Sequence, residues 1–403
     1  MKIPHDGFCV LPWISLEASP VGTVRPCCLA DDEIRDNDGN KFELATADFS
    51  DIQHSNHMRD LRREFFAGRR PETCRKCWNE EDAGRKSKRM HTLDRLKHSV
   101  KDDHWSTDAK PLMFLDLKLG NICNLKCRIC GSWSSSQFAA EEISFTPREE
   151  QKTSHAYRML RAGAWPKENN HFWQQIDSVL EDIRYIEFTG GEPFMIDQHF
   201  DMLQGIVDRG VADQVEIHYN TNGTLFPDRG PEIWRHFKTV EIAFSVDDIG
   251  PRFEYQRSNA SWDTVKENIN RFRIMRESMP NLQLQCCTTV NIFNVRYLDE
   301  VALWIALQDF DFVYWNMMHD AWYFSISRLP ASAKQQLTHH LTTCEVPEQY
   351  QSEIVRIVNF MNNGESSDGE ETRKQVQKLD QRRRQDLQNT APELARILDY
   401  AKI

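Results

Sequence analysis

The chain has 403 residues, which is too long for one ordinary domain and predicts two or three. Hydrophobic residues make up 40% and charged residues 28%, which is a globular composition, while 17 Gly and 16 Pro exclude a collagen-like or low-complexity chain. Fifty Lys plus Arg against 61 Asp plus Glu give a net charge of −11, which argues against a protein that binds polyanions over its whole surface.

Polar residues and prolines interrupt the start of the chain, where a secretory signal peptide needs an unbroken apolar segment. No stretch approaches the roughly 18 consecutive apolar residues of a membrane span. We therefore expect a cytoplasmic protein with no membrane partner. Eleven cysteines in a reducing compartment do not form a disulfide framework, so their spacing indicates metal or redox chemistry.

Five cysteines fall in the first hundred residues, where no alternation of strands and helices is visible. We predict that residues 1–100 form a separate small domain. Four thiolates can ligate one [4Fe-4S] cluster or one tetrahedral zinc ion, and the spacing is compatible with both. The predicted metal ligands are Cys9, Cys27, Cys74 and Cys77. Cys28 is the alternative to Cys27.

A basic run surrounds the last two of these cysteines. Residues 59–98 contain 13 Lys or Arg against seven Asp or Glu. Such a run forms either a solvated helical face or a surface that attracts an acidic leader peptide, a nucleotide or RNA. No RNA-binding signature accompanies it, and we expect no nucleic-acid partner.

From residue 112 onward, apolar runs typical of strands alternate with amphipathic runs typical of helices, the latter beginning near His171 and Ser261. This alternation predicts an α/β fold with a parallel sheet, open or closed into a partial barrel, over residues 110–328. Its chemistry is expected at the carboxyl ends of the strands. Residues 329–403 are charged and predicted to be helical. The six predicted strands span residues 112–119, 183–188, 215–219, 240–246, 282–290 and 312–315.

Three cysteines with the spacing C-x3-C-x2-C lie in the loop after the first predicted strand, namely Cys123, Cys127 and Cys130. Three thiolates hold three irons of a [4Fe-4S] cube and leave the fourth iron open for chemistry. Structural zinc sites usually have four ligands and paired C-x2-C spacings, so zinc fits this loop less well.

This loop resembles the cluster-binding loop of the radical S-adenosylmethionine (radical SAM) enzymes, in which the open iron binds the methionine part of the cofactor. The segment at 190–193 resembles the family's GGEP motif, whose backbone and Glu side chain contact the same methionine. Glycine suits this role because a residue without Cβ lets the backbone approach a ligand closely. The resemblance implies a partial (β/α)6 barrel. It also implies a cofactor site made of Gly190, Gly191, Glu192, Pro193, Asn222, Ser245 and Asp247.

The N-terminal cysteines, with Gly22 four residues before the Cys27–Cys28 pair, resemble the SPASM and twitch modules of many radical SAM enzymes. In those enzymes the module follows the barrel, and a full SPASM module has seven cysteines. Here the five cysteines precede the barrel. The resemblance implies one auxiliary [4Fe-4S] cluster.

As a whole, the resemblance implies an oxidoreductase that reductively cleaves S-adenosylmethionine to a 5′-deoxyadenosyl radical, with an external electron donor of the flavodoxin or ferredoxin type. We expect this radical to start the oxidative modification of a ribosomally made peptide. The alternatives are two-electron oxidation of a small alcohol such as a cyclitol, peptide epimerisation through a thiol such as Cys286 or Cys287, modification of an RNA base, and a non-catalytic Cys-rich scaffold.

Three residues are candidates for catalysis on the substrate. His319 and Asp320 follow the last predicted strand, at the end of the barrel where chemistry occurs, and either can serve as a base. Arg257 resembles an arginine of peptide-acting relatives. Asp116, within the first predicted strand, is a further polar candidate.

Overall fold

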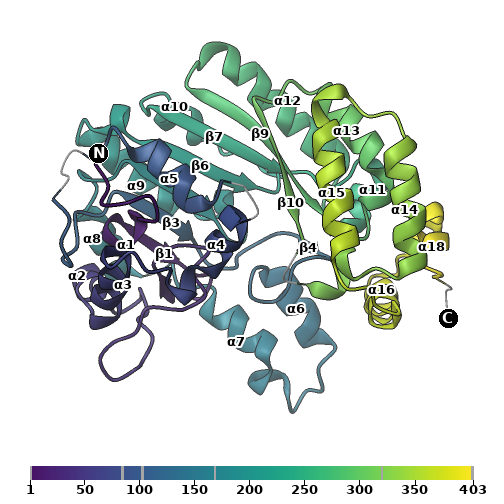
Figure 1. Cartoon of the computed structure of the whole chain (residues 1–403), viewed down its shortest axis with the longest axis horizontal. Helices are drawn as coiled ribbons and strands as arrows, with labels where there is room; N and C mark the ends of the chain where they lie inside the picture. The colour runs from purple at the N-terminus through teal and green to yellow at the C-terminus, as the bar shows by residue number, and fades with distance from the viewer. Residues whose placement is uncertain (1, 83–85, 101–103, 168, 319–320, 401–403) are drawn as a thin grey trace. The chain divides into compact units, whose positions relative to one another are not determined.

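The computed structural model describes residues 2–82, 86–100, 104–167, 169–318 and 321–400 (Figure 1). The chain divides into two compact units, which are described separately. The first unit comprises Met1–Cys123, Ser132–Asn220 and Pro227–Glu241. The second unit comprises Asn124–Gly131, Thr221–Phe226 and Ile242–Ile403.

The first unit is built on a mostly parallel sheet with the strand order β2-β1-β3-β5-β6. Only the pairing of β1 with β2 is antiparallel; β3 pairs in parallel with β1 and β5, and β5 with β6. The predicted strands at 112–119, 183–188 and 215–219 are confirmed as β3, β5 and β6. The strands are β1 (Ser15–Ala18), β2 (Val24–Arg25), β3 (Phe114–Lys118), β5 (Tyr185–Thr189) and β6 (Glu216–Thr221), the last residue of which belongs to the second unit.

One face of this sheet is apolar and packs against helices. Phe188 of β5 stacks on Tyr219 of β6 at 5.0 Å between ring centroids and contacts His199 of α9 (Gln198–Asp208). The predicted helix from His171 is confirmed as α8 (Asn170–Asp177), which buries Phe172 and Ile176. The other helices of the first unit are α1 (Leu11–Ile14), α2 (Phe49–Gln53), α3 (Asn56–Phe66), α4 (Arg75–Asp82), α5 (Lys88–Leu96), α6 (Ser136–Ser144), α7 (His155–Ala162) and α10 (Gly230–Trp234).

The N-terminal region shares the core of the first unit. Trp13 of α1 is fully buried, and Arg62 of α3 is also fully buried. The Arg62 guanidinium donates to the Pro12 carbonyl at 2.9 Å and to Gln53 Oε1 at 2.6 Å. These bonds replace the hydrogen bonds to water that the guanidinium loses on burial. Because β1 adds to the edge of β3, residues before 100 extend the parallel sheet and lie in the same compact unit as its first strands.

In the second unit the strand order is β7-β9-β10, and β9 pairs in parallel with β10. The predicted strands at 240–246, 282–290 and 312–315 are confirmed as β7 (Thr239–Ser245), β9 (Leu282–Val290) and β10 (Phe312–Met317). The first three residues of β7 belong to the first unit. The predicted helix from Ser261 is confirmed as α12 (Trp262–Ser278), which buries Trp262, Val265 and Phe272. Two other helices are α11 (Gly250–Gln256) and α13 (Leu298–Ala306).

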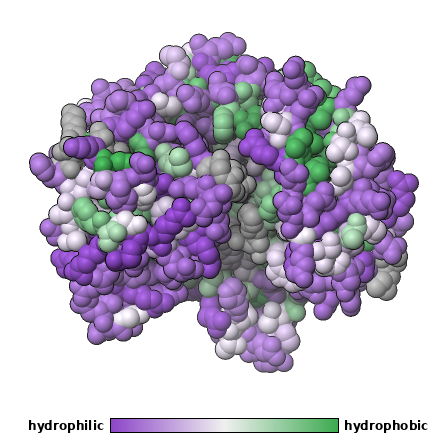
Figure 2. Space-filling model, viewed as in Figure 1, coloured by the Kyte–Doolittle hydropathy of each residue, from purple (hydrophilic) through white to green (hydrophobic). Residues whose placement is uncertain are grey.

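The region after residue 329 is helical, as predicted, and its helices α14 and α15 run side by side at the yellow-green end of the chain (Figure 1). Hydrophilic residues dominate the visible face of the molecule, and apolar ones appear there in small groups (Figure 2). In the part of the chain that the structure describes, no helix is both long and apolar enough to span a membrane. The C-terminal helices are α14 (Ala331–Thr343), α15 (Gln351–Asn363), α16 (Glu370–Arg383), α17 (Leu387–Thr390) and α18 (Pro392–Ile397).

The C-terminal helices hold the loop of the second and third motif cysteines through one buried ion pair. Arg128, which is 1% exposed, donates from Nη2 to Asp380 Oδ1 of α16 at 2.5 Å. The same carboxylate accepts hydrogen bonds from the hydroxyls of Tyr255 at 2.9 Å and Tyr400 at 2.8 Å, and from the Leu387 backbone at 3.0 Å. Four donors compensate the desolvation of this carboxylate.

We predict that Asp380→Ala lowers the free energy of unfolding by about 3–5 kcal/mol, because it leaves the Arg128 guanidinium buried without a counter-charge. Denaturant titration followed by circular dichroism measures the change. The matched control is Lys374→Ala, at an exposed position of the same helix, which we expect to change stability by less than about 0.5 kcal/mol. Equal effects of the two substitutions would contradict the anchoring role of Asp380.

Candidate functional site

Four of the five N-terminal cysteines line one cavity in the first unit, which we call the four-cysteine cavity. Cys9 precedes α1, Cys27 follows β2, and Cys74 and Cys77 lie where a short 3-10 turn continues into α4. The remaining lining is apolar apart from Arg89. Side chains separated by 68 residues in sequence therefore face the same enclosed space.

The sulfur atoms of this cavity are widely spaced. Among the described residues, only Asp299, His340 and Cys344 place three potential ligand atoms within 4.8 Å of one another, so no three cavity sulfurs are that close. Thiolates around a single zinc ion lie about 3.8 Å apart, because four Zn–S bonds of about 2.3 Å point to the corners of a tetrahedron. In this arrangement the four sulfurs are therefore not spaced as the ligands of one zinc ion.

The cavity thiols are neutral at pH 7 unless a metal binds them. Burial raises the pKa of Cys9 well above its ordinary value, and the negative charges of Cys74 and Cys27 thiolates raise it further. Burial also raises the pKa of Cys27, to about 11. Iron ions supply the positive charge that stabilises such thiolates, so the donor set fits an iron–sulfur cluster.

Cys28 has different neighbours from Cys27. It does not line the cavity, and the charges that act on its thiol include those of Lys88, Asp116 and Glu187, which belong to α5, β3 and β5. Burial is the main cause that raises the pKa of this thiol, while Lys88 lowers it. The cysteine set that shares the cavity is therefore the predicted one that contains Cys27.

The GGEP segment in the first unit packs tightly on the beginning of the cysteine-motif loop. The Gly191 backbone donates to the Gly120 carbonyl at 3.2 Å, and the Glu192 backbone donates to the Ile122 carbonyl at 2.8 Å. A Cβ atom on Gly191 would lie 2.1 Å from that Ile122 carbonyl oxygen, so only glycine fits. Cys123 follows at once, and its backbone donates to Ser136 Oγ at 3.2 Å.

In the second unit, the other two motif cysteines lie beside a buried ion pair. Cys127 belongs to β4 (Lys126–Cys127), which pairs with β8 (Arg257–Ser258). A hydrogen bond from Cys130 lowers the pKa of Cys127 to about 7, and the Arg257 guanidinium contributes to the decrease. Arg257 Nη2 lies 2.7 Å from Asp247 Oδ2 and its Nη1 lies 3.9 Å from Cys127 Sγ. Arg257 therefore faces both the Asp247 carboxylate and the Cys127 sulfur, and its role in catalysis on the substrate stays a prediction.

The remaining predicted cofactor residues lie at strand ends, as expected. Asn222 follows β6, and its side chain accepts a hydrogen bond from the Thr224 backbone at 2.9 Å and donates to Asn124 Oδ1 at 2.9 Å. Ser245 is the last residue of β7, and Asp247 accepts a hydrogen bond from the Thr289 backbone at 2.9 Å. Glu192 is 1% exposed, and Pro193 opens a 3-10 turn.

A row of titratable side chains crosses the polar face of the sheet in the first unit. Glu17, Asp116, Glu187 and His218 occupy the same register position on β1, β3, β5 and β6. His218 Nδ1 lies 2.9 Å from Glu241 Oε2, which continues the row. We call these five residues the polar row; four of them are acidic.

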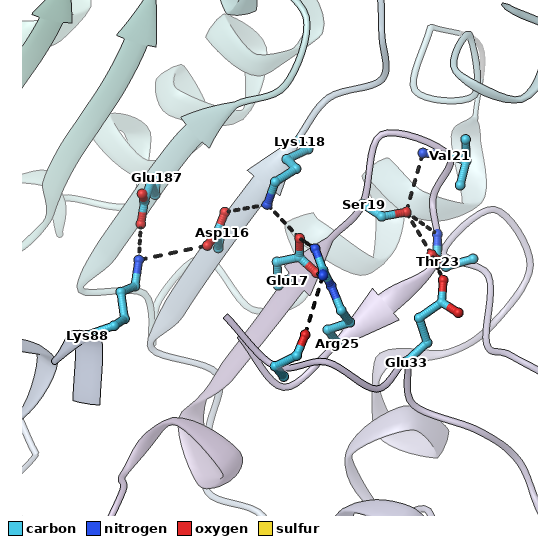
Figure 3. A network of polar contacts seen from close by, with 11 residues as sticks. Glu17, Ser19, Val21, Thr23, Arg25, Glu33, Lys88, Asp116, Lys118 and Glu187 are labelled. Carbon is cyan, nitrogen blue, oxygen red and sulfur yellow. Dashed lines mark hydrogen bonds and ion pairs between the residues drawn. The ribbon is translucent and has the colours of Figure 1, made fainter. Parts of the chain in front are cut away.

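Basic side chains lie between these acids (Figure 3). Lys118 Nζ is 2.5 Å from Glu17 Oε1 and 3.5 Å from Asp116 Oδ1. Lys88 Nζ is 2.6 Å from Glu187 Oε2 and 3.9 Å from Asp116 Oδ2. Arg25 donates to both oxygens of Glu17, at 2.8 and 2.9 Å. The charges therefore alternate along the row.

The predicted substrate residues have different outcomes. His319 and Asp320 lie outside the described residues, so their role as a base stays a prediction.

The basic run at 59–98 is not simply a solvated helical face, because several of its members point inward. Arg62 and Arg89 are buried, and Lys88 and Arg95 pair with carboxylates of the polar row.

The sequence pattern did not single out Lys88 or Glu187, although a signal was present. Each of the strands β1, β3, β5 and β6 is apolar at alternate positions and carries charged residues between them. Side chains alternate between the two faces of a strand, so this pattern places the charges of neighbouring strands on a common face. Lys88 had no such signal because it comes from a helix.

Comparison with known families finds two matches. Residues 117–303 match the model of the radical SAM superfamily, and residues 9–78 match the iron-sulfur cluster-binding domain named SPASM. The second match covers all four cysteines of the four-cysteine cavity. A comparison with curated proteins finds no matching sequence.

Solved structures with a related arrangement are distant. Native anSMEcpe with bound AdoMet is 17% identical with a TM-score of 0.40; the match covers 58% of this chain and 60% of that one. Streptococcus suis SuiB bound to its precursor peptide SuiA is 12% identical with a TM-score of 0.34; the match covers 77% and 65%. This chain thus spans less than two thirds of the length of these proteins.

The two family matches supply the cofactors. The radical SAM region implies S-adenosylmethionine and a [4Fe-4S] cluster, and the SPASM region implies an auxiliary iron–sulfur cluster. The motif cysteines, the GGEP segment and the four-cysteine cavity all fall inside the matched residues. The chain therefore contains a radical SAM region at residues 117–303, preceded by a SPASM iron–sulfur cluster-binding domain at residues 9–78.

Proposed function

We propose that this radical SAM enzyme oxidatively modifies a ribosomally made peptide, with an auxiliary cluster in the four-cysteine cavity as the acceptor of the second electron. The observation that carries this proposal is that four cysteines face one cavity. Four protein ligands leave no iron open for substrate, so such a cluster is suited to electron transfer. The choice of a peptide rests on the resemblance to radical SAM enzymes with SPASM or twitch modules, which modify peptides or oxidise cyclitol alcohols.

In this proposal the residues around the catalytic cluster and the cofactor have separate roles. Cys123, Cys127 and Cys130 would hold the catalytic cluster, which supplies the electron that cleaves S-adenosylmethionine when both are bound. The hydrogen bond from Cys130 and the charge of the Arg257 guanidinium favour the ionised form of Cys127, since both lower the pKa of that thiol. Gly191 would let the backbone approach the methionine part of the cofactor, and Glu192 would bind its amino group. The external electron donor is of the flavodoxin or ferredoxin type.

A second candidate is two-electron oxidation of a small alcohol. It shares the two clusters and differs only in the substrate. A cyclitol and a peptide with a hydroxyl side chain therefore both belong in the tests.

We predict about eight irons per chain in anaerobically reconstituted protein, from two four-iron clusters. The double substitution Cys74→Ala and Cys77→Ala should halve the iron, measured by a colorimetric assay together with zinc analysis. Cys28→Ser is the matched control and should leave the iron unchanged, whereas Cys27→Ser should lower it. Stoichiometric zinc, or loss of iron in the Cys28 variant, would contradict the ligand assignment.

We further predict that the reconstituted enzyme with a strong reductant releases 5′-deoxyadenosine from S-adenosylmethionine, as measured by liquid chromatography. Cys127→Ala should abolish this product because the catalytic cluster loses a ligand. A non-catalytic scaffold would give no product with either protein, even when both clusters are present.

For the reaction itself, we expect the substrate to lose two hydrogens. Candidate precursor peptides and a cyclitol are incubated with the enzyme and analysed by mass spectrometry. Loss of two hydrogens from the peptide supports the proposal, and the same loss from the cyclitol supports the alternative. An unchanged mass with uptake of solvent deuterium indicates epimerisation and would refute oxidation.

A further inference from the structure

One buried carboxylate in the polar row lacks hydrogen-bond donors. Asp116 is 1% exposed, and neither of its side-chain oxygens has a hydrogen-bond partner among the described residues. Its neighbours Lys118 and Lys88 lie 3.5 and 3.9 Å away, which is beyond direct hydrogen-bond distance. A buried ionised carboxylate normally accepts several hydrogen bonds, so Asp116 is held in a poorly compensated state.

The two lysines are engaged elsewhere. Lys118 lies 2.5 Å from Glu17, and Lys88 lies 2.6 Å from Glu187. These contacts keep the partner carboxylates charged: the pKa of Glu187 falls to about 2, and that of Glu17 is also lowered. Burial raises the pKa of all three carboxylates, but only in Asp116 does it outweigh the nearby cations; the Glu187 charge raises the Asp116 pKa further, while Lys118 opposes the change. Asp116 is thus the member of this group that most readily gains a proton.

The charged side chains around Asp116 lie next to the four-cysteine cavity. Arg89 lines the cavity, and the preceding residue, Lys88, interacts electrostatically with Cys27 as well as with Asp116. Arg25 similarly interacts with Cys27 and pairs with Glu17. A change of charge in the cavity therefore changes the electrostatic potential at the side chains that surround Asp116.

We propose that Asp116 takes up a proton when the auxiliary cluster in the four-cysteine cavity gains an electron. The inference rests on the proposed function, because it assumes that a cluster occupies this cavity. With Asp116 ionised, the three cations Arg25, Lys88 and Lys118 balance three carboxylates. A proton on Asp116 leaves one excess positive charge, which compensates the electron added to the cluster.

In turnover the atoms and electrons balance. A substrate C–H bond breaks, and its hydrogen atom joins the 5′ carbon of the deoxyadenosyl radical. The substrate radical would then lose one electron, which the auxiliary cluster would accept, and one proton from a neighbouring O–H, N–H or S–H group, with Asp116 taking up one proton. The substrate has then lost two hydrogens, and when the external electron carrier removes the electron, Asp116 releases its proton to solvent.

The charged groups that face Asp116 come from every neighbouring element and determine the direction of the effect. They are Glu17 on β1, Lys118 on β3, Glu187 on β5, Lys88 on α5 and the Cys28 thiol, and Arg25 on β2 pairs with Glu17. Reduction adds negative charge nearby and so favours the protonated carboxyl. Between the Asp116 pKa values of the oxidised and reduced states, the reduction potential must therefore fall as the pH rises.

The test is a redox titration of the auxiliary cluster at a series of pH values. The full-length chain with Cys123, Cys127 and Cys130 replaced by Ala isolates its electron paramagnetic resonance signal. We expect the midpoint potential to fall by about 59 mV per pH unit, because a one-electron couple shifts by that amount for a tenfold change in proton concentration. Asp116→Asn should remove the pH dependence while the signal persists.

The matched control is Glu241→Gln, which changes another acid of the polar row whose oxygens are already bonded to His218 and Arg95. This variant should keep the slope. A flat titration in the parent protein, or the same slope in Asp116→Asn, would overturn the proposal. Absence of any auxiliary signal would instead refute the proposed function, so the two failures are distinguishable.

A second measurement covers the case in which Asp116→Asn does not fold. The infrared difference spectrum of the parent protein, reduced minus oxidised, should contain a positive C=O band of a protonated carboxylic acid that shifts in D2O. Specific isotope labelling of aspartate assigns the band to Asp rather than Glu. A difference spectrum without this band contradicts proton uptake by Asp116.

Discussion

The alternation of charge along the polar row is the constraint on which the first unit depends. Parallel strands normally bury apolar side chains on both faces, because helices cover both. Here one face of the sheet carries Glu17, Asp116 and Glu187 at one register position of β1, β3 and β5, and His218 of β6 continues the row. Such a row is tolerated only if cations lie between the acids, since an unpaired buried charge is costly. Lys118, Lys88 and Arg25 meet this need. Two of these cations come from the N-terminal region, so that region completes the sheet electrostatically as well as by adding β1.

The same arrangement links the two kinds of chemistry in the first unit. The segment from Cys27 to Cys28 has one thiol at the four-cysteine cavity and the next among the charges of the polar row. In the same way, Arg89 lines the cavity, whereas Lys88 lies among the charges of the polar row. Consecutive residues with opposite orientations therefore connect the four-cysteine cavity, the candidate electron acceptor, with the surroundings of Asp116, the candidate proton acceptor.

Local patterns predicted the elements well. Hydrophobic periodicity located the six longer strands, β3, β5, β6, β7, β9 and β10, and the helices α8 and α12, because burial of a face requires a fixed repeat. Cysteine spacing and the GGEP segment predicted the cofactor class for a similar reason: ligand geometry restricts residue types at short sequence distances. The strands β1 and β2 were not predicted, because four- and two-residue strands carry too little pattern.

The amino-acid sequence by itself determined the six longer strands, the C-x3-C-x2-C loop and the cofactor class, since each is encoded in contiguous residues. Only the tertiary structure decided which cysteine faces the cavity, because Cys27 and Cys28 are adjacent and differ only in direction. It also decided that Arg257 pairs with Asp247, and that Asp116 lies between two lysines without a hydrogen bond from either. Such facts depend on distances between segments that are far apart in sequence, and no local pattern records those distances.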